Sequence, residues 1–328
     1  MMISMRDRKL NLTLSRAAFV ALCLGVAHAA ISLPAAQARP LRAASTAAAQ
    51  QETFATPEAA SEALVDAVER LDVEALTRLL GAEGVDLVIT VDEVANKTQA
   101  ALFAEQAHLR TGVEIDPDDS GVAIMSIGPD RWPLPIPIVE ESGRWRFDAE
   151  AGREEILNRR IGGNELVAID VCVGFVDAQH EYAFEKRPGA QVNQYARRIV
   201  STPGTRDGLA WQDADGEWRG PVGKEIAQAI EDGYQGQSPF HGYLFRVLRG
   251  QGPDAPMGEL DFVVNGAMIG GFALVAAPAD YGITGVMTFM VSHDGVVYEK
   301  DLGAATLEQF RAMEQFNPDS SWRPVTTE

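Results

Sequence analysis

Two kinds of hydrophobic periodicity follow one another in the first half of the chain, and the first is helical. Apolar residues recur at helical spacing after Thr56-Pro57-Glu58, where Thr can cap a helix, Pro fits its first position and Glu favours its positive end. Asp72 is the expected cap of a second helix that ends at Gly81. The pattern predicts two helices between residues 56 and 81.

Strand-like alternation follows between residues 122 and 147. Residues 122–127 are apolar on both faces, which is typical of a strand buried on both sides. Prolines occupy every second position within residues 132–138, so this segment is expected at a sheet edge or in a polyproline conformation. Trp145 and Phe147 share one face of a further strand. The sequence predicts an N-terminal α+β domain over residues 53–150, with helices and a curved antiparallel sheet, similar to the nuclear-transport-factor-2 type.

The second half, residues 151–328, begins with a third helix of about 20 residues after Asn164. Leu166, Ile169, Val173 and Val176 mark its apolar arc, and its polar stripe is narrow. A helix with so little polar surface is expected to lie against a sheet.

An antiparallel meander and a closing helix over residues 305–316 are expected next. Asn265-Gly266 and Asp294-Gly295 are residue pairs that two-residue hairpins prefer, because both positions need positive φ. The predicted strands are residues 241–249, 259–264, 271–277, 286–292 and 296–302. The fold class is therefore α+β, with a C-terminal long helix packed on an antiparallel meander.

The N-terminus has the pattern of a secretory signal peptide over residues 1–38. Four basic residues precede a stretch from Ala17 to Ala38 without charge, and small residues at Ala36 and Ala38 suit signal peptidase. Residues 39–52 are Ala-rich and indicate a flexible linker. We expect a periplasmic or secreted protein without a stable membrane span after cleavage; the alternative is a retained membrane anchor.

Charge and cysteine content narrow the class of protein. The 328 residues carry 28 Lys+Arg and 47 Asp+Glu, a net charge of −19, which argues against nucleic acid as a partner. Of the 2 cysteines, one lies in the signal segment, so Cys172 has no intramolecular disulfide partner after cleavage. Its apolar neighbours, Val171 and Val173, predict a buried, unreactive thiol.

Several longer motifs resemble an exported bacterial family known as domain of unknown function 2950. The resemblance covers essentially the whole chain after the signal and implies a secreted or periplasmic protein. It carries over no catalytic residue. The motifs are Arg131-Trp132-Pro133-Leu134-Pro135-Ile136-Pro137, Gly152 to Arg160, Ser201-Thr202-Pro203-Gly204, Pro239-Phe240-His241-Gly242-Tyr243 and Gly285-Val286-Met287-Thr288-Phe289.

The C-terminal half also resembles the soluble heads of type IV pilins and pseudopilins. The segments that carry this resemblance are Tyr195-Ala196, Gly242 to Phe245, Ala276 to Val286 and Asp294 to Val297. It implies a helix across a four-stranded antiparallel meander. The apolar assembly segment of pilins does not precede Asn164, so polymerisation into a pilus is not expected.

One acidic loop has the spacing that opens a calcium site. Asp116, Asp118 and Ser120 supply oxygen ligands at positions 1, 3 and 5, and Gly121 follows at position 6. Position 12 is Ile127, where a calcium loop needs a bidentate Glu. An acidic surface turn is therefore the favoured interpretation, and no metal or cofactor is expected.

His241 is the first candidate for a reactive or ligand-binding group. It can change charge near neutral pH, and Phe240 and Tyr243 flank it. The enzyme hypothesis is an envelope hydrolase that uses His241 with a carboxylate such as Asp261 or Asp280. The favoured alternative is a histidine at a strand start that hydrogen-bonds a loop carbonyl.

The favoured function is a non-catalytic binding or envelope-scaffold role, because no nucleophile, base and orienting partner converge in the sequence. The two alternatives are the hydrolase and a pilus- or secretion-associated assembly component. The expected partners are envelope proteins or a small ligand. Arg153, Glu154, Glu155, Arg159 and Arg160 offer an anion site, although ion pairs at i, i+4 spacing on one helix are favoured.

Overall fold

The computed structural model describes residues 51–187, 189–224, 226–227, 229 and 239–326. The predicted signal peptide and most of the predicted linker lie outside these residues. The described chain divides into two compact units, residues 51–159 and residues 160–326, whereas the sequence placed the boundary between residues 150 and 151. Gln51, within the predicted linker, donates from its side chain to the carbonyls of Leu79 and Phe147, each at 2.7 Å.

Capping residues define the helices of the N-terminal unit as the sequence predicts. Thr56 accepts a hydrogen bond from Ala59 N at the start of α2 (Pro57–Glu69). Asp72 accepts from Ala75 N at the start of α3 (Val73–Leu80), which Gly81 ends. A third α-helix, α4 (Glu93–Leu109), was not predicted; it buries only alanines and therefore lacks a strong apolar stripe. The short 3-10 helix η2 (Val85–Leu87) lies between α3 and α4 in the chain.

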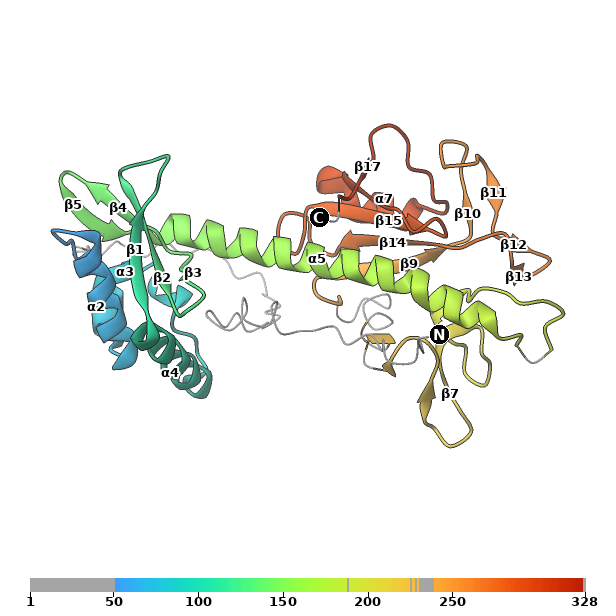
Figure 1. Ribbon diagram of the computed structural model, residues 1–328, viewed down its shortest axis with the longest axis horizontal. Helices are drawn as coiled ribbons and strands as arrows, with labels where there is room; N and C mark the ends of the chain where they lie inside the picture. The colour runs from blue at the N-terminus through green and yellow to red at the C-terminus, as the bar shows by residue number, and fades with distance from the viewer. Residues whose placement is uncertain (1–50, 188, 225, 228, 230–238, 327–328) are drawn as a thin grey trace, which may run out of the picture. The chain divides into compact units, whose positions relative to one another are not determined.

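One antiparallel sheet completes this unit (Figure 1). Its strand order is β1-β2-β4-β5, and β3 also pairs with β2. Its core joins side chains of α2 and α3, such as Leu64 and Leu76, to Met125, Ile138 and Phe147 of the sheet. The strands are β1 (Thr111–Ile115), β2 (Val122–Ile127), β3 (Trp132–Pro133), β4 (Ile138–Glu141) and β5 (Arg144–Phe147).

The proline-rich segment has its predicted form only in part. It divides into β3 and β4, which pair with opposite ends of β2 and leave Leu134 to Pro137 between them. The prolines lie, as expected, at a sheet edge or outside the strands: Pro133 is in β3, which pairs only with β2 among the described strands, and Pro135 and Pro137 lie in no strand. The last residue of the predicted segment, Ile138, differs, because β4 pairs with β2 on one side and with β5 on the other. Ile138, which follows the last proline, has its own amide donor and can enter the interior of the sheet.

The helix predicted from Asn164 is longer than expected. Helix α5 (Ala149–Phe184) has 36 residues and continues through Gly162 and Gly163. Its buried face also differs from the predicted arc. Leu166 and Val173 are 66% and 44% exposed. Val176 of the predicted arc is buried, and the other buried side chains of this stretch are Val167, Ala168, Cys172, Phe175, Ala178, Gln179 and Tyr182.

The C-terminal unit is built around a five-stranded antiparallel sheet of order β17-β16-β15-β14-β9, with α5 lying across it (Figure 1). The predicted strand over residues 259–264 is absent from this sheet, since β9 pairs directly with β14. The strands are β9 (Tyr243–Leu248), β14 (Ala273–Pro278), β15 (Met287–Ser292), β16 (Val297–Asp301) and β17 (Arg323–Pro324).

Short strands and one helix complete this unit. Strands β12 and β13 form the predicted hairpin, with φ of 49° at Asn265 and 79° at Gly266. The closing helix α7 (Thr306–Ala312) is shorter than predicted and follows the 3-10 helix η3 (Gly303–Ala305). The remaining strands are β6 (Arg198–Val200), β7 (Gly208–Gln212), β8 (Trp218–Arg219), β10 (Gly250–Gln251), β11 (Leu260–Asp261), β12 (Val263–Val264) and β13 (Ala267–Met268).

Polar contacts hold both ends of the part of α5 that lies in the C-terminal unit. Asn164 donates to the carbonyl of Thr284 at 2.8 Å. The carboxylate of Glu165 accepts from the amides of Val286 and Met287 at 2.9 and 3.0 Å. At the other end, the buried Gln179 both donates to and accepts from the backbone of Ala196, at 2.8 Å in each case. These contacts fix the register of α5 on the sheet and the position of the segment that leads into β6.

Candidate functional site: an arginine-lined groove

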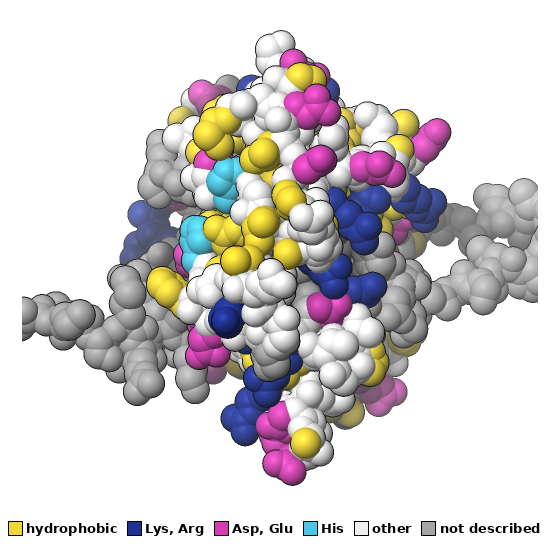
Figure 2. Space-filling model, turned by 90° about the vertical axis from the view of Figure 1, so that its right-hand side faces the viewer, with side chains coloured by type: hydrophobic (Ala, Val, Ile, Leu, Met, Phe, Trp, Pro, Cys, Tyr) yellow, Lys and Arg dark blue, Asp and Glu magenta, His cyan; other side chains and the backbone are white. Residues whose placement is uncertain are grey.

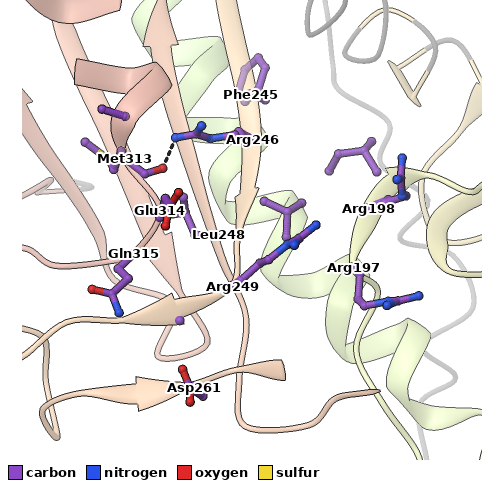
Figure 3. A pocket seen from close by; sticks show the side chains of 14 residues that line it. Arg197, Arg198, Phe245, Arg246, Leu248, Arg249, Asp261, Met313, Glu314 and Gln315 are labelled. Atoms are coloured by element: carbon purple, nitrogen blue, oxygen red, sulfur yellow. Dashed lines mark hydrogen bonds between the residues drawn. The ribbon is translucent and has the colours of Figure 1, made fainter. Parts of the chain in front are cut away.

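A groove of about 910 Å³ lies in the C-terminal unit along β9. One wall is the start of β6 and the residue before it, and another is the segment that follows α7 (Figure 3). We call it the arginine groove, and the residues that define it are Arg197, Arg198, Ile199, Phe245, Arg246, Val247, Leu248, Arg249, Gly250, Asp261, Ala312, Met313, Glu314 and Gln315.

Arg197 and Arg198 are held at the groove by a shared carboxylate. Asp207 lies 3.8 Å from each guanidinium. Burial raises the pKa of Asp207, but hydrogen bonds from Thr205 and Thr202 outweigh that effect and lower its pKa below the usual value. The carboxylate therefore stays ionised at neutral pH. Both arginine side chains remain accessible, with 47% and 58% of their surface exposed.

A turn in one of the sequence motifs positions that carboxylate. The amide of Thr202 donates to Asp207 at 2.8 Å, and its hydroxyl donates at 3.0 Å. Thr205 adds a further hydroxyl donor at 2.8 Å. Motif Ser201-Thr202-Pro203-Gly204 thus forms a compact loop between β6 and β7 that fixes the group orienting two groove arginines.

Arg246 has a structural role at the same groove. Its guanidinium donates to the carbonyl of Arg311 at 2.9 Å and to the carbonyls of Phe310 and Met313, the last contact being visible in Figure 3. It also lies 5.1 Å from the ring centroid of Phe310. A cation is favourable at the C-terminus of a helix, where carbonyls lack intrahelical partners. Arg246 therefore fastens α7 and its following segment to β9.

Arg249 is the groove arginine most available to a ligand. It is exposed at the end of β9, and within the described residues no carboxylate forms an ion pair with it. Asp261 and Glu314 are the two carboxylates in the groove lining, against four arginines. On the face drawn in Figure 2, several basic side chains gather to the right of the middle, and acidic side chains lie above them and at the lower edge. The groove is thus locally positive on a chain with a net charge of −19.

The three residues of the hydrolase hypothesis do not meet in one place. Asp261 lies in the arginine groove, but His241 precedes the other end of β9, a strand that spans roughly 17 Å. Asp280 lies closer to His241, because Ala279 N donates to the carbonyl of Gly242 at 2.9 Å. Within the described residues, neither carboxylate hydrogen-bonds His241. The catalytic assignment stays a prediction.

His241 itself lies in a tight turn. Its φ is 45°, and backbone hydrogen bonds join Phe240 and Tyr243 on either side of it at 3.0 Å. The ring packs edge-on against Phe240, with 4.7 Å between centroids. Desolvation lowers the pKa of His241 below its ordinary value, which favours the neutral imidazole at neutral pH. His241 is therefore a weaker candidate than the groove arginines for binding an anionic ligand.

The calcium candidates form the loop between β1 and β2. A side-chain oxygen of Asp116 accepts from the amide of Asp118 at 2.8 Å, and Asp119 accepts from Gly121 N at 2.9 Å. Ile127, at position 12, is buried in β2. Within the part of the chain that the structure describes, no group of three or more His, Cys, Asp or Glu gathers as a metal site requires.

Two further candidates have structural partners. The predicted i, i+4 ion pair on α5 forms between Arg159 and Glu155 at 2.7 Å, and Arg153 pairs instead with Asp86 at 2.7 Å. The hydrogen bond from Arg153 is the main cause of a lowered pKa at Asp86. Cys172 is fully buried, and burial raises its pKa to about 12, so the thiolate is disfavoured at neutral pH.

Comparison with known proteins places this chain in a family. The sequence model of a family described as protein of unknown function (DUF2950) matches residues 51–325. The chain belongs to the DUF2950 family. No curated protein and no solved structure matches it. The resemblances to pilin heads and to the nuclear-transport-factor-2 type stay predictions, although the C-terminal part of this DUF2950 protein does carry a long helix and an antiparallel sheet.

The arginine groove was missed by reasoning from the sequence. Arg197-Arg198 is an adjacent pair in the sequence, and Arg246 and Arg249 lie near the end of a predicted strand. Those signals are ordinary by themselves, because charged side chains are common at strand ends. Only the approach of β6 to β9 in the fold brings them together.

Among the described helices of this DUF2950 protein, none combines the length and apolarity needed to cross a bilayer.

Proposed function

We propose that this DUF2950 protein is an exported, non-catalytic binding protein that holds a carboxylate-rich ligand in the arginine groove. The observation that carries the proposal is the meeting of Arg197, Arg198 and Arg249 in one groove on a strongly acidic chain. Guanidinium groups bind carboxylates through paired, charge-assisted hydrogen bonds. Export is supported by the signal-like pattern of residues 1–38.

The negative net charge of the chain restricts the binding of acidic ligands to places where arginines lie close together. A net charge of −19 repels anions at long range, so an acidic ligand gains affinity only where arginines lie within hydrogen-bonding reach. Asp207 lies 3.8 Å from the guanidinium groups of Arg197 and Arg198. Each guanidinium carries five N–H donors, so donors remain for a ligand beside this ion pair. Arg246 keeps the opposite wall attached, because it donates to carbonyls at the C-terminal end of α7 and to that of Met313.

The test is binding of a fluorescein-labelled oligoglutamate of about eight residues to the purified protein, measured by fluorescence polarisation. We expect saturable binding that weakens as salt rises from about 20 to about 150 mM. The triple variant Arg197→Gln, Arg198→Gln, Arg249→Gln is expected to lose at least about tenfold in affinity, because each substitution removes a charged donor.

The matched control is Arg323→Gln in β17, an exposed arginine on the opposite edge strand of the same sheet. This variant is expected to bind oligoglutamate as the parent protein does. An uncharged oligoglutamine of equal length is the ligand control and is expected not to bind. Equal affinity of the triple variant and the parent would contradict the proposal.

Export gives a separate expected result. When the full chain is expressed in a Gram-negative bacterium, the protein is expected in the periplasmic fraction, with Arg39 as its N-terminal residue after cleavage at Ala38. N-terminal sequencing of the fractionated protein measures this directly. Recovery of uncleaved chain in the membrane fraction would favour the retained anchor instead.

A further inference from the structure

Two carboxylates of the arginine groove have no use in the binding of an anion. Asp261 and Glu314 belong to the groove lining, and in the view of Figure 3 they lie on the opposite side of Arg249 from Arg197 and Arg198. Both side chains are exposed. Within the described residues, neither carboxylate forms an ion pair or a side-chain hydrogen bond, although four arginines line the same groove. A purely anionic ligand is repelled by these two groups.

Backbone pairing brings the two segments that carry these carboxylates to either side of Gly250. Gly250 opposes Asp261 across β10 and β11, and its carbonyl accepts from Phe316 N at 2.9 Å. Directly opposed residues of an antiparallel pair direct their side chains to one face. Asp261 therefore shares the face on which Gly250 has no side chain, and a Cβ atom at Gly250 would lie 3.8 Å from the side-chain nitrogen of Gln315. No side chain of Gly250 separates Asp261 from the segment of Glu314 and Gln315.

We infer that the ligand of the arginine groove carries an ammonium group as well as carboxylates, and that Asp261 and Glu314 bind the ammonium. The inference rests on the proposed function, because the arginines bind the carboxylates of the same ligand. An ammonium has three N–H donors and no acceptor. The two carboxylates and the side-chain carbonyl of Gln315 are acceptors of the kind that it requires.

The chemical class is an acidic peptide, or a smaller amino-acid derivative, with a free amine at one end. The groove lining runs along the chain from Phe245 to Gly250, which corresponds to roughly 17 Å of strand. An extended peptide of about five residues spans this length. One short ligand can therefore place its amine near Asp261 and its carboxylates near the arginines. The amine can be a peptide N-terminus or a lysine-type side chain.

The experiment compares the peptide Gly-Gly-Glu-Glu-Glu-Glu-Lys(fluorescein)-amide with its N-acetylated form. The two probes carry the same carboxylates, and only the first has an N-terminal ammonium. Fluorescence polarisation measures their affinities for the purified protein. We expect the probe with the free amine to bind at least about threefold more tightly, a modest ratio because the two carboxylates are exposed to solvent.

The double variant Asp261→Asn, Glu314→Gln tests which residues bind the ammonium. It is expected to bind the free-amine probe more weakly than the parent protein does and the acetylated probe more tightly, because it removes both the attraction and the repulsion. The matched control is Glu259→Gln, Glu308→Gln, which removes two exposed carboxylates that are not in the groove lining. Since both double variants change the net charge equally, the control is expected to keep the preference for the free amine.

A second pair of probes identifies the source of the ammonium. In acetyl-Lys-Gly-Glu-Glu-Glu-Glu-Lys(fluorescein)-amide the ammonium belongs to a lysine side chain, and the matched probe is acetylated on that side chain as well. A preference for the amine in this pair alone indicates a lysine-type ligand. A preference in the first pair alone indicates a peptide N-terminus. Either result supports the inference.

The outcomes separate the inference from the proposed function. Equal affinities within both pairs of probes, with a loss of binding in the triple arginine variant, would overturn the ammonium inference and leave the anion-binding function standing. The inference would also be wrong if the control double variant lost the preference as the Asp261 and Glu314 variant does, because long-range charge would then explain it. Absence of binding by every probe would overturn both. Binding of the acetylated probe to the Asp261 and Glu314 variant shows that this variant is folded.

Discussion

Replacement of Phe272 by alanine is expected to lower the free energy of unfolding of the C-terminal unit by about 3–5 kcal/mol. Phe272 has no exposed surface and lies at the centre of an aromatic cluster. Its ring centroid is 5.6 Å from that of Phe175 and 4.8 Å from that of Tyr195, and both contacts are edge-to-face. The substitution removes this packing and leaves a cavity that rigid neighbours on α5 and on the sheet cannot fill.

Urea unfolding followed by tryptophan fluorescence measures this loss. The matched control is Phe184→Ala at the end of α5, where the side chain is 83% exposed. The control is expected to change the free energy of unfolding by less than about 0.5 kcal/mol. A loss below about 1 kcal/mol for Phe272→Ala would show that this cluster is not a main stabilising contact between α5 and the sheet.

The second large effect is a loss of stability in alkali that depends on Cys172. Burial raises the pKa of this thiol from 9.0 to about 12. Between these two values the unfolded chain releases the proton while the folded chain keeps it, so stability falls as pH rises. Each pH unit in this window costs about 1.4 kcal/mol, which gives about 2.7 kcal/mol from pH 9 to about pH 11. Below pH 9 the thiol makes no contribution to the pH dependence.

The measurement is the free energy of unfolding in urea at several pH values from about 8 to about 11. Cys172→Ala is expected to flatten the alkaline slope by about 1.4 kcal/mol per pH unit. Tyr243 remains in the variant, and because burial also raises its pKa, some alkaline loss is expected to persist above about pH 10. Identical slopes for parent and variant would contradict the assigned burial of the thiol.

Four arginines line one groove of a chain whose net charge is −19. Asp207 orients two arginines, and its own carboxylate is satisfied by the threonine hydroxyls and an amide of the Ser201–Gly204 turn region. Arg246 has a different role, since it fastens the C-terminal end of α7 and the following Met313 to β9. One family motif thus shapes the groove without contributing a ligand-binding side chain of its own.

Local signals in the sequence determined much of the N-terminal unit. Thr56, Asp72 and Gly81 define helix ends, because capping depends on groups within a few residues of one another. The α+β class and the pairing of a long helix with an antiparallel sheet also followed from periodicity. The sequence did not predict helix α4, because its buried residues are alanines, which give a weak amphipathic pattern.

Tertiary structure decided the features that depend on contacts between distant residues. Gly162 and Gly163 disfavour a helix locally, yet α5 continues through them, with the contacts of Asn164 and Glu165 to residues 284–287 immediately after. The place of β9 at the end of the strand order depends on pairing between distant segments, which periodicity does not encode. By itself the sequence determined the helix caps and the strand periodicity, because these depend on neighbouring residues. It also determined the acidic net charge, which depends on composition alone. The groove depends on β6 and β9 meeting across about 50 residues of chain, and only the fold brings them together.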